Sequence, residues 1–173
     1  MTQELTNLRN SILEERYADA LAMVDELEAM SRQATVRQIE FFISRLLIGL
    51  IKNQVEQRLT NAWVASISDA IRQIKKLNTR ETRTDYYIKK DEWEPLIEDE
   101  FEAAIDAASA ETMDGIYPPF QLAKMIDKTQ LIFLTKNFLF LIYDYPVKEL
   151  PALVKENLVQ LVGGEQWKNG RWD

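Results

Sequence analysis

Residues 41–54 read FFISRLLIGLIKNQ, the most apolar stretch of the chain, and an arginine stands inside it. On a helical wheel of about 100° per residue, the apolar positions between 36 and 51 cover roughly half of the circle. These positions are Val36, Ile39, Phe42, Ile43, Leu46, Leu47, Leu50 and Ile51. The polar residues Gln38, Arg45, Lys52 and Glu56 fall within about 40° of each other. Arg45 therefore belongs to a narrow polar stripe on an otherwise apolar helix, and other helices are expected to surround such a helix.

The polar stripe has two interpretations. Long Arg and Lys side chains can bury their aliphatic stems while their charged ends reach water, which requires no function. Alternatively the stripe lines a groove, and the candidate groove residues are then Arg45, Lys52 and, on the following helix, Arg72.

Composition limits the chemistry that this chain can perform. The chain has 173 residues, which favours a single domain, and it contains no Cys and no His. Thiol nucleophiles, disulfides, Ser-His-Asp triads and zinc sites built on imidazole or thiolate are therefore excluded. We predict no cofactor. The net charge of −7 disfavours general affinity for nucleic acid and for anionic membranes.

The sequence predicts a cytoplasmic protein. The first residues, MTQELTNLRN, have no apolar core of the kind found in signal peptides. The two most apolar runs are interrupted by polar residues, at Ser44 and Arg45 in the first and at Lys136 and Asn137 in the second. Neither run reaches the roughly 18 consecutive apolar residues of a membrane span.

Apolar residues recur with helical spacing along most of the chain, and strand-like alternation is nearly absent. The periodicity predicts helices over 3–16, 20–30, 33–57, 60–77, 91–113, 119–127, 129–143 and 151–161, with a break near Ser31. Thr60 is a good N-cap, and Asp91 with Glu94 resembles a capping box. The tail EQWKNGRWD is expected to be loosely held. We predict an all-α, up-and-down helical bundle over 1–128 with a helical extension, 129–173, packed on the same domain.

Several stretches resemble the family called "domain of unknown function 29". They are DELEAM at 25–30, RLLIGLIK at 45–52, AWVASISDAIRQI at 62–74 and YPPF at 117–120. The resemblance covers about residues 16–126, and 129–167 looks like the C-terminal extension of some members. It implies a helical bundle from a bacterium and brings no activity, substrate or cofactor.

Matching positions within that resemblance are Lys52, Trp63, Ile67 and Arg72. Members often carry a His where this chain has Gly49, beside Arg45 on the predicted polar stripe. If that His performs a shared reaction, this chain has lost it. Trp63 heads an apolar stripe and is expected to lie in the core rather than to hold a ligand.

Two adjacent segments carry opposite charge. Residues 72–90 are basic and include Tyr86 and Tyr87, which is compatible with weak nucleic-acid binding. The next segment, 91–114, is acidic, and four of its acids recur every four residues to form an acidic ridge: Glu94, Glu98, Glu102 and Asp106. The simplest interpretation is that the basic segment lies near the ridge and compensates its charge. The alternative is that the ridge holds Mg²⁺, since carboxylates suit hard cations.

The predicted helix 129–143 is apolar on all sides, with Thr129 and Lys136 marking a thin polar line. Either the monomer buries the whole helix, or a partner covers part of it. The second reading makes Phe133, Phe140 and Tyr143 a candidate interface, most simply in a homodimer.

The function most consistent with these observations is a non-enzymatic helical protein–protein interaction module that associates with itself. The alternative is a carboxylate-dependent magnesium hydrolase, and a weak nucleic-acid binder is third. Acids that cluster toward the interior would favour the hydrolase, whereas acids that face solvent would favour the interaction module.

Overall fold

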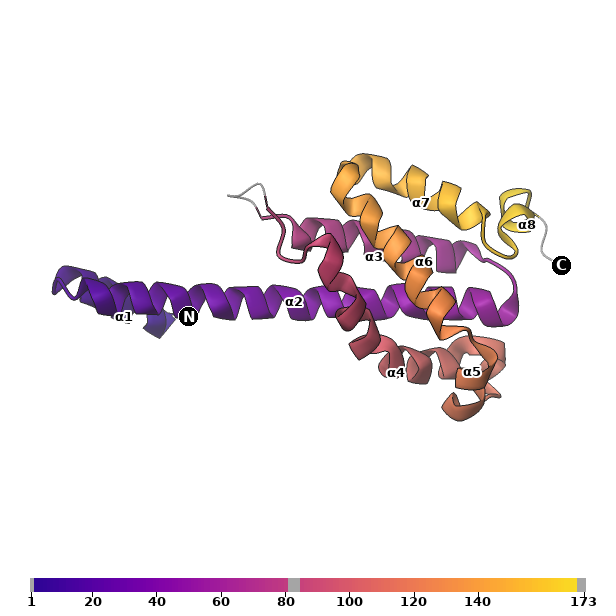
Figure 1. The fold of residues 1–173 in the computed structure, drawn as a ribbon, viewed down its shortest axis with the longest axis horizontal. Helices are drawn as coiled ribbons and strands as arrows, with labels where there is room; N and C mark the ends of the chain where they lie inside the picture. Colours follow the sequence, from indigo (N-terminus) through magenta and orange to yellow (C-terminus); the bar gives the residue numbers. More distant parts are fainter. Residues whose placement is uncertain (1, 81–84, 171–173) are drawn as a thin grey trace. The chain divides into compact units, whose positions relative to one another are not determined.

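The structure is a computed structural model that describes residues 2–80 and 85–170. The described residues form α-helices and short 3-10 turns, and their one β-type contact is a bridge between Thr79 and Tyr86. The helices are α1 (Thr2–Leu13), α2 (Tyr17–Glu56), α3 (Asn61–Asn78), α4 (Trp93–Glu111), α5 (Pro119–Met125), α6 (Lys128–Asp144), α7 (Leu150–Val159) and α8 (Gly164–Lys168). The predicted all-α fold is confirmed (Figure 1).

Contacts divide the chain into two compact units, Met1–Arg37 and Gln38–Asp173. This boundary lies inside α2, whereas the sequence predicted a division between 128 and 129. The predicted extension belongs with the second unit, because α6 and α7 contribute to the same hydrophobic core as α3 and α4.

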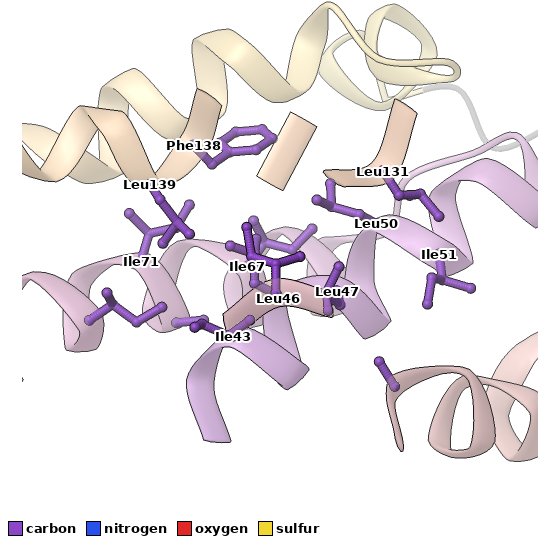
Figure 2. Packing of buried hydrophobic residues seen from close by; sticks show 14 of the residues in the cluster. Ile43, Leu46, Leu47, Leu50, Ile51, Ile67, Ile71, Leu131, Phe138 and Leu139 are labelled. Atoms are coloured by element: carbon purple, nitrogen blue, oxygen red, sulfur yellow. The ribbon is translucent and has the colours of Figure 1, made fainter. Parts of the chain in front are cut away.

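The second unit is organised around the apolar half of α2. The side chains of Ile39, Ile43, Leu46, Leu47, Leu50 and Ile51 are at most 1% exposed. They pack with Ile67 and Ile71 of α3 and with Leu131, Phe138 and Leu139 of α6 (Figure 2). The helical wheel of residues 36–51 therefore predicted the centre of this core.

The first unit is a helical hairpin in which α1 lies alongside the first turns of α2 (Figure 1). Glu15 adopts φ 60° after the end of α1, and the amide of Arg16 donates to the carbonyl of Ser11 at 2.8 Å. This is a Schellman-type helix end, which reverses the chain before α2 begins at Tyr17. The helices are antiparallel, because Ser11 contacts Met23 while Asn7 and Leu27 line the same small pocket.

The expected break near Ser31 is wrong, because α2 runs without interruption from Tyr17 to Glu56. The stretch around Ser31 is polar but contains no Gly or Pro. Polar residues lower helix propensity by only a few tenths of a kcal/mol each, which does not end a helix.

The two predicted helix starts had different outcomes. Thr60 caps α3 as predicted, and its side chain accepts a hydrogen bond from the amide of Trp63 at 3.2 Å. The capping box at Asp91 is wrong: a 3-10 turn, Lys90–Glu92, precedes α4, and its N-cap Glu92 makes no side-chain cap bond.

The tail is held more firmly than expected up to Gly170. Residues Gly164–Lys168 form α8, and Nε1 of Trp167 donates to Oδ1 of Asn61 at 2.9 Å. The turn before α8 depends on Gly163, which has φ 77° and would place a Cβ 2.6 Å from Cα of Arg58. The last three residues of the predicted loose tail lie outside the described residues.

Candidate functional site

Arg45 and Arg72 meet at one carboxylate between α2 and α3. Nη2 of Arg72 lies 2.8 Å from Oδ1 of Asp69, and Nη1 of Arg45 lies 3.9 Å from Oδ2 of the same residue. Arg45 also donates to Oγ of Ser66 at 3.2 Å. The hydrogen bond from Arg72 holds the pKa of Asp69 below its usual value, and burial opposes this shift. Both guanidinium groups thus share one carboxylate within the chain.

Lys52, the third predicted groove residue, lies apart from this cluster. Its Nζ pairs with Oε2 of Glu111 at the end of α4 and lies 5.9 Å from the ring centre of Trp63. Trp63 is half-buried rather than a core residue, and Arg58 covers its ring at 5.1 Å. The predicted stripe is therefore a row of partly exposed ion pairs, each of which contributes little to stability.

Gly49 does not belong to the polar stripe. It is buried, and a Cβ at this position would lie 2.6 Å from Cγ1 of Ile67. The glycine lets α2 and α3 approach closely. A His at this position would collide with Ile67 unless the two helices moved apart.

Helix α6 is wrapped by the monomer more completely than the sequence suggested. Leu131, Thr135, Phe138, Leu139 and Ile142 are buried. The predicted interface residues are separated: Phe133 is 62% exposed, whereas Phe140 and Tyr143 pack against the core. The charged residues Lys128, Lys136, Glu94 and Glu98 surround Phe133. Three residues that the sequence grouped therefore do not form one apolar surface.

Tyr143 belongs to a hydrogen-bonded cluster that joins α3, α4 and α6. Its hydroxyl donates to the carbonyl of Ile88 at 2.6 Å and accepts from Nε1 of Trp93 at 2.7 Å. Asn78, which is fully buried, accepts from the amide of Ile88 at 2.7 Å and donates to its carbonyl at 2.9 Å. Burial raises the pKa of Tyr143 to about 12. The cluster holds residues 85–90 on the helices, and among the described tryptophans Trp93, not Trp63, is fully buried.

Over residues 72–80 and 85–114, no ion pair joins the basic segment to the acidic ridge, as the predicted charge compensation would require. In the described part of the chain, Lys90 pairs with Asp144, Arg80 with Asp85 and Arg72 with Asp69, while Glu94 of the ridge pairs with Lys136 of α6. Residues 81–84 of the basic segment lie outside the described residues. The tyrosines are also occupied: Lys75 lies over Tyr86 at 5.5 Å and Arg80 over Tyr87 at 4.9 Å.

The acidic ridge faces solvent, since all four of its side chains are exposed. Over residues 2–80 and 85–170, no group of three Asp or Glu side chains is placed to hold a metal ion. On the same helix, burial together with Glu40 and Asp99 raises the pKa of Glu100. The orientation of the ridge is the one that favours the interaction module over the hydrolase.

An open pocket of about 280 Å³ lies between α2, α6 and α7, and sequence reasoning did not identify it. Its polar lining consists of amides: Asn53, Gln54, Gln130, Asn137, Asn157 and Gln160. Several of these amides already bond within the chain, as Asn53 does to the carbonyl of Val162 at 2.7 Å and Gln54 to Gln130 at 2.9 Å. These amides come from three helices and, for Gln160, from the residue that follows α7, with no common spacing, so no sequence signal could have found the pocket.

A group of uncovered apolar side chains belongs to the N-terminal hairpin. Leu5 is 53% exposed, Ile12 50%, Tyr17 59% and Leu21 66%, with Val24 next to them. Only Ser11 and Ala20 are buried among the described residues of this unit. We call Leu5, Ile12, Tyr17, Leu21 and Val24 the hairpin face.

Helical geometry places these five residues on one side of the hairpin. On a helical wheel of about 100° per residue, take as the reference the direction in which each helix faces the other. Each of the five residues lies roughly 60–120° from that direction, on the side of increasing wheel angle. Antiparallel helices turn in opposite senses for a viewer looking along the hairpin, so the two displacements lead to the same side. Helical spacing in 3–16 and 20–30 predicted amphipathic helices here, but the sequence could not show that α1 leaves this side uncovered.

None of the helices in residues 2–80 and 85–170 combines the length and the apolarity required to cross a membrane. Comparison of the chain with protein-family models, with curated proteins and with solved structures gives no match. The class that the fold defines is therefore an all-α helical protein, and the resemblance to the "domain of unknown function 29" family stays a prediction from the residues.

Proposed function

We propose that this chain is a helical protein–protein interaction module, without catalytic activity, that associates with itself through the hairpin face. The observation that carries the proposal is a hairpin of fewer than 40 residues with almost no core of its own. Units of this size are usually stable only with disulfides, metals or a partner. The chain has no Cys.

Burying the exposed apolar side chains of the hairpin face would stabilise a dimer. Fully burying a Val, Leu, Ile or aromatic side chain is worth about 1.5–3 kcal/mol. Five such side chains on one side of a hairpin favour association, whereas a lone exposed residue such as Phe133 does not. The outward acidic ridge and the paired arginines support an interaction role rather than hydrolysis.

Light scattering coupled to size exclusion tests this proposal on the full chain at tens of micromolar. The expected mass is twice the 20.2 kDa of one chain. Leu21→Asp should give a monomer in which the second unit stays folded, because it places a charge in the hairpin face. The control is Phe133→Asp, the same type of change on α6, which should leave the mass unchanged. A monomeric parent protein would refute self-association.

A further inference from the structure

We infer that the cover of the hairpin face is the hairpin face of a second copy, related by a two-fold axis parallel to the helices. This inference rests on the proposed self-association and adds the occupant's orientation. The hairpin face can pack against a copy of itself, because both surfaces are apolar. Two hairpins joined in this way enclose the interior of a four-helix bundle. Closed two-fold pairing is also the commonest assembly of identical chains.

Charges at the outer edges of the face indicate the direction of the axis. By the same wheel geometry, Arg9 of α1 and Asp25 of α2 each lie at the outer edge of the hairpin face. This edge is the side of each helix that is turned away from the other helix of the hairpin. Arg9 is level with Asp25, because Ser11 contacts Met23 and Asn7 lies opposite Leu27. In the part of the chain that the structure describes, no hydrogen bond or ion pair involves Arg9 or Asp25.

A two-fold axis parallel to the helices packs α1 of one copy against α2 of the other. This rotation does not change the position of any residue along the axis. Arg9 then faces Asp25 of the partner subunit along both edges. Inside the face, Ile12 lies opposite Leu21 of the partner subunit. All neighbouring helices in this bundle are antiparallel, as in common four-helix bundles.

The other face-to-face arrangement has its axis perpendicular to the helices. It would pack α1 on α1 and α2 on α2, and Arg9 would not lie next to Asp25 of the partner subunit. The two arrangements bury the same apolar residues, so only the polar edges distinguish them. The edge charges favour the parallel axis, because it pairs opposite charges twice.

Charge reversal on the full chain tests this pairing by sedimentation equilibrium. Arg9→Glu and Asp25→Arg should each raise the dimer dissociation constant by about tenfold or more, because like charges then meet at both edges. The double variant should return to within about threefold of the parent, and its dimer should weaken with salt. If the double variant loses as much dimer stability as the two single variants lose together, the inference is overturned. The proposed function would still stand in that case, provided that the parent protein is a dimer.

Crosslinking provides a second measurement that does not depend on charge. The chain contains no Cys, so single replacements act without background. Ile12→Cys and Leu21→Cys should each stay uncrosslinked alone, because identical helices lie diagonally in the bundle. An equilibrated and oxidised mixture of the two variants should give covalent dimers. Covalent dimers from either variant alone would establish the perpendicular axis and overturn the inference, as would a mixture that gives none. A monomeric parent protein would instead overturn both proposals.

Discussion

Asn78 is the side chain that most directly links the loop before α4 to the core. It is fully buried and makes one hydrogen bond to the amide of Ile88 and one to its carbonyl. Its sequence context, directly after a helix predicted to end at residue 77, indicated only a polar loop. The pairing depends on the path of residues 85–90, which periodicity does not describe.

Asn78→Ala should lower the free energy of unfolding by about 1–3 kcal/mol, because the buried amide of Ile88 loses its acceptor. Chemical denaturation of parent and variant measures the difference. Asn157→Ala is a matched control, since the side chain of the exposed Asn157 donates to the carbonyl of Leu153, one turn before it. Equal effects at the two positions would show that the bonds to Ile88 contribute nothing.

Tyr143 should make stability depend on alkaline pH. Its folded pKa is raised to about 12 from an ordinary value of 10.0, chiefly by burial, so the folded state favours the neutral phenol. The unfolded chain releases this proton first, and stability that is complete below the unfolded pKa is lost as pH rises toward the folded pKa.

The measurement is the free energy of unfolding of the parent and of Tyr143→Phe between about pH 9 and pH 12. The parent should lose stability more steeply than the variant over this range. At neutral pH the variant should be less stable, because Trp93 and Ile88 lose the hydroxyl. Parallel curves would show that the phenol titrates alike in both states.

The contact between α2 and α3 depends on a small residue facing a branched one. Gly49 leaves the space that Ile67 fills, and a Cβ there would lie 2.6 Å from Cγ1 of Ile67. The helical wheel located both helices and their apolar sides correctly. It could not assign Gly49 to the helix contact, because which apolar neighbour faces a residue depends on the pairing of helices.

Gly49→Ala should lower the free energy of unfolding, because overpacking costs about 1–3 kcal/mol while Ala gains about 1 kcal/mol in helix propensity. Combining it with Ile67→Val should cost less than the sum of the two single changes by about 0.5 kcal/mol or more. Thermal and chemical unfolding of the four proteins completes the cycle. Additive effects would mean that Ile67 moves aside freely.

The two compact units differ in how far each can fold alone. The cluster of buried hydrophobic residues around α2 runs from Ile39 to Leu158, so it lies entirely in the second unit. The first unit buries Ser11 and Ala20 and little else among its described residues. The second unit therefore contains what a cooperative fold requires, and the first unit requires a partner.

Deleting residues 1–37 should leave a cooperatively unfolding helical protein that is monomeric. Circular dichroism during heating and light scattering measure the two properties. The melting temperature of the parent should rise with protein concentration, because association stabilises the folded dimer, and that of the shortened chain should not. A shortened chain that stays dimeric would place the interface in the second unit.

Composition and periodicity alone determined the all-α class, the apolar half of α2 and the N-cap at Thr60. These features are local, since helix propensity, caps and apolar spacing act within a few turns of one segment. Only the tertiary structure decided that Arg45 and Arg72 share Asp69, that Gly49 faces Ile67 and that Tyr143 is occupied inside the chain. It likewise decided that the hairpin face is left uncovered while most of α6 is buried. Each depends on which helices are neighbours, and packing between distant segments decides that.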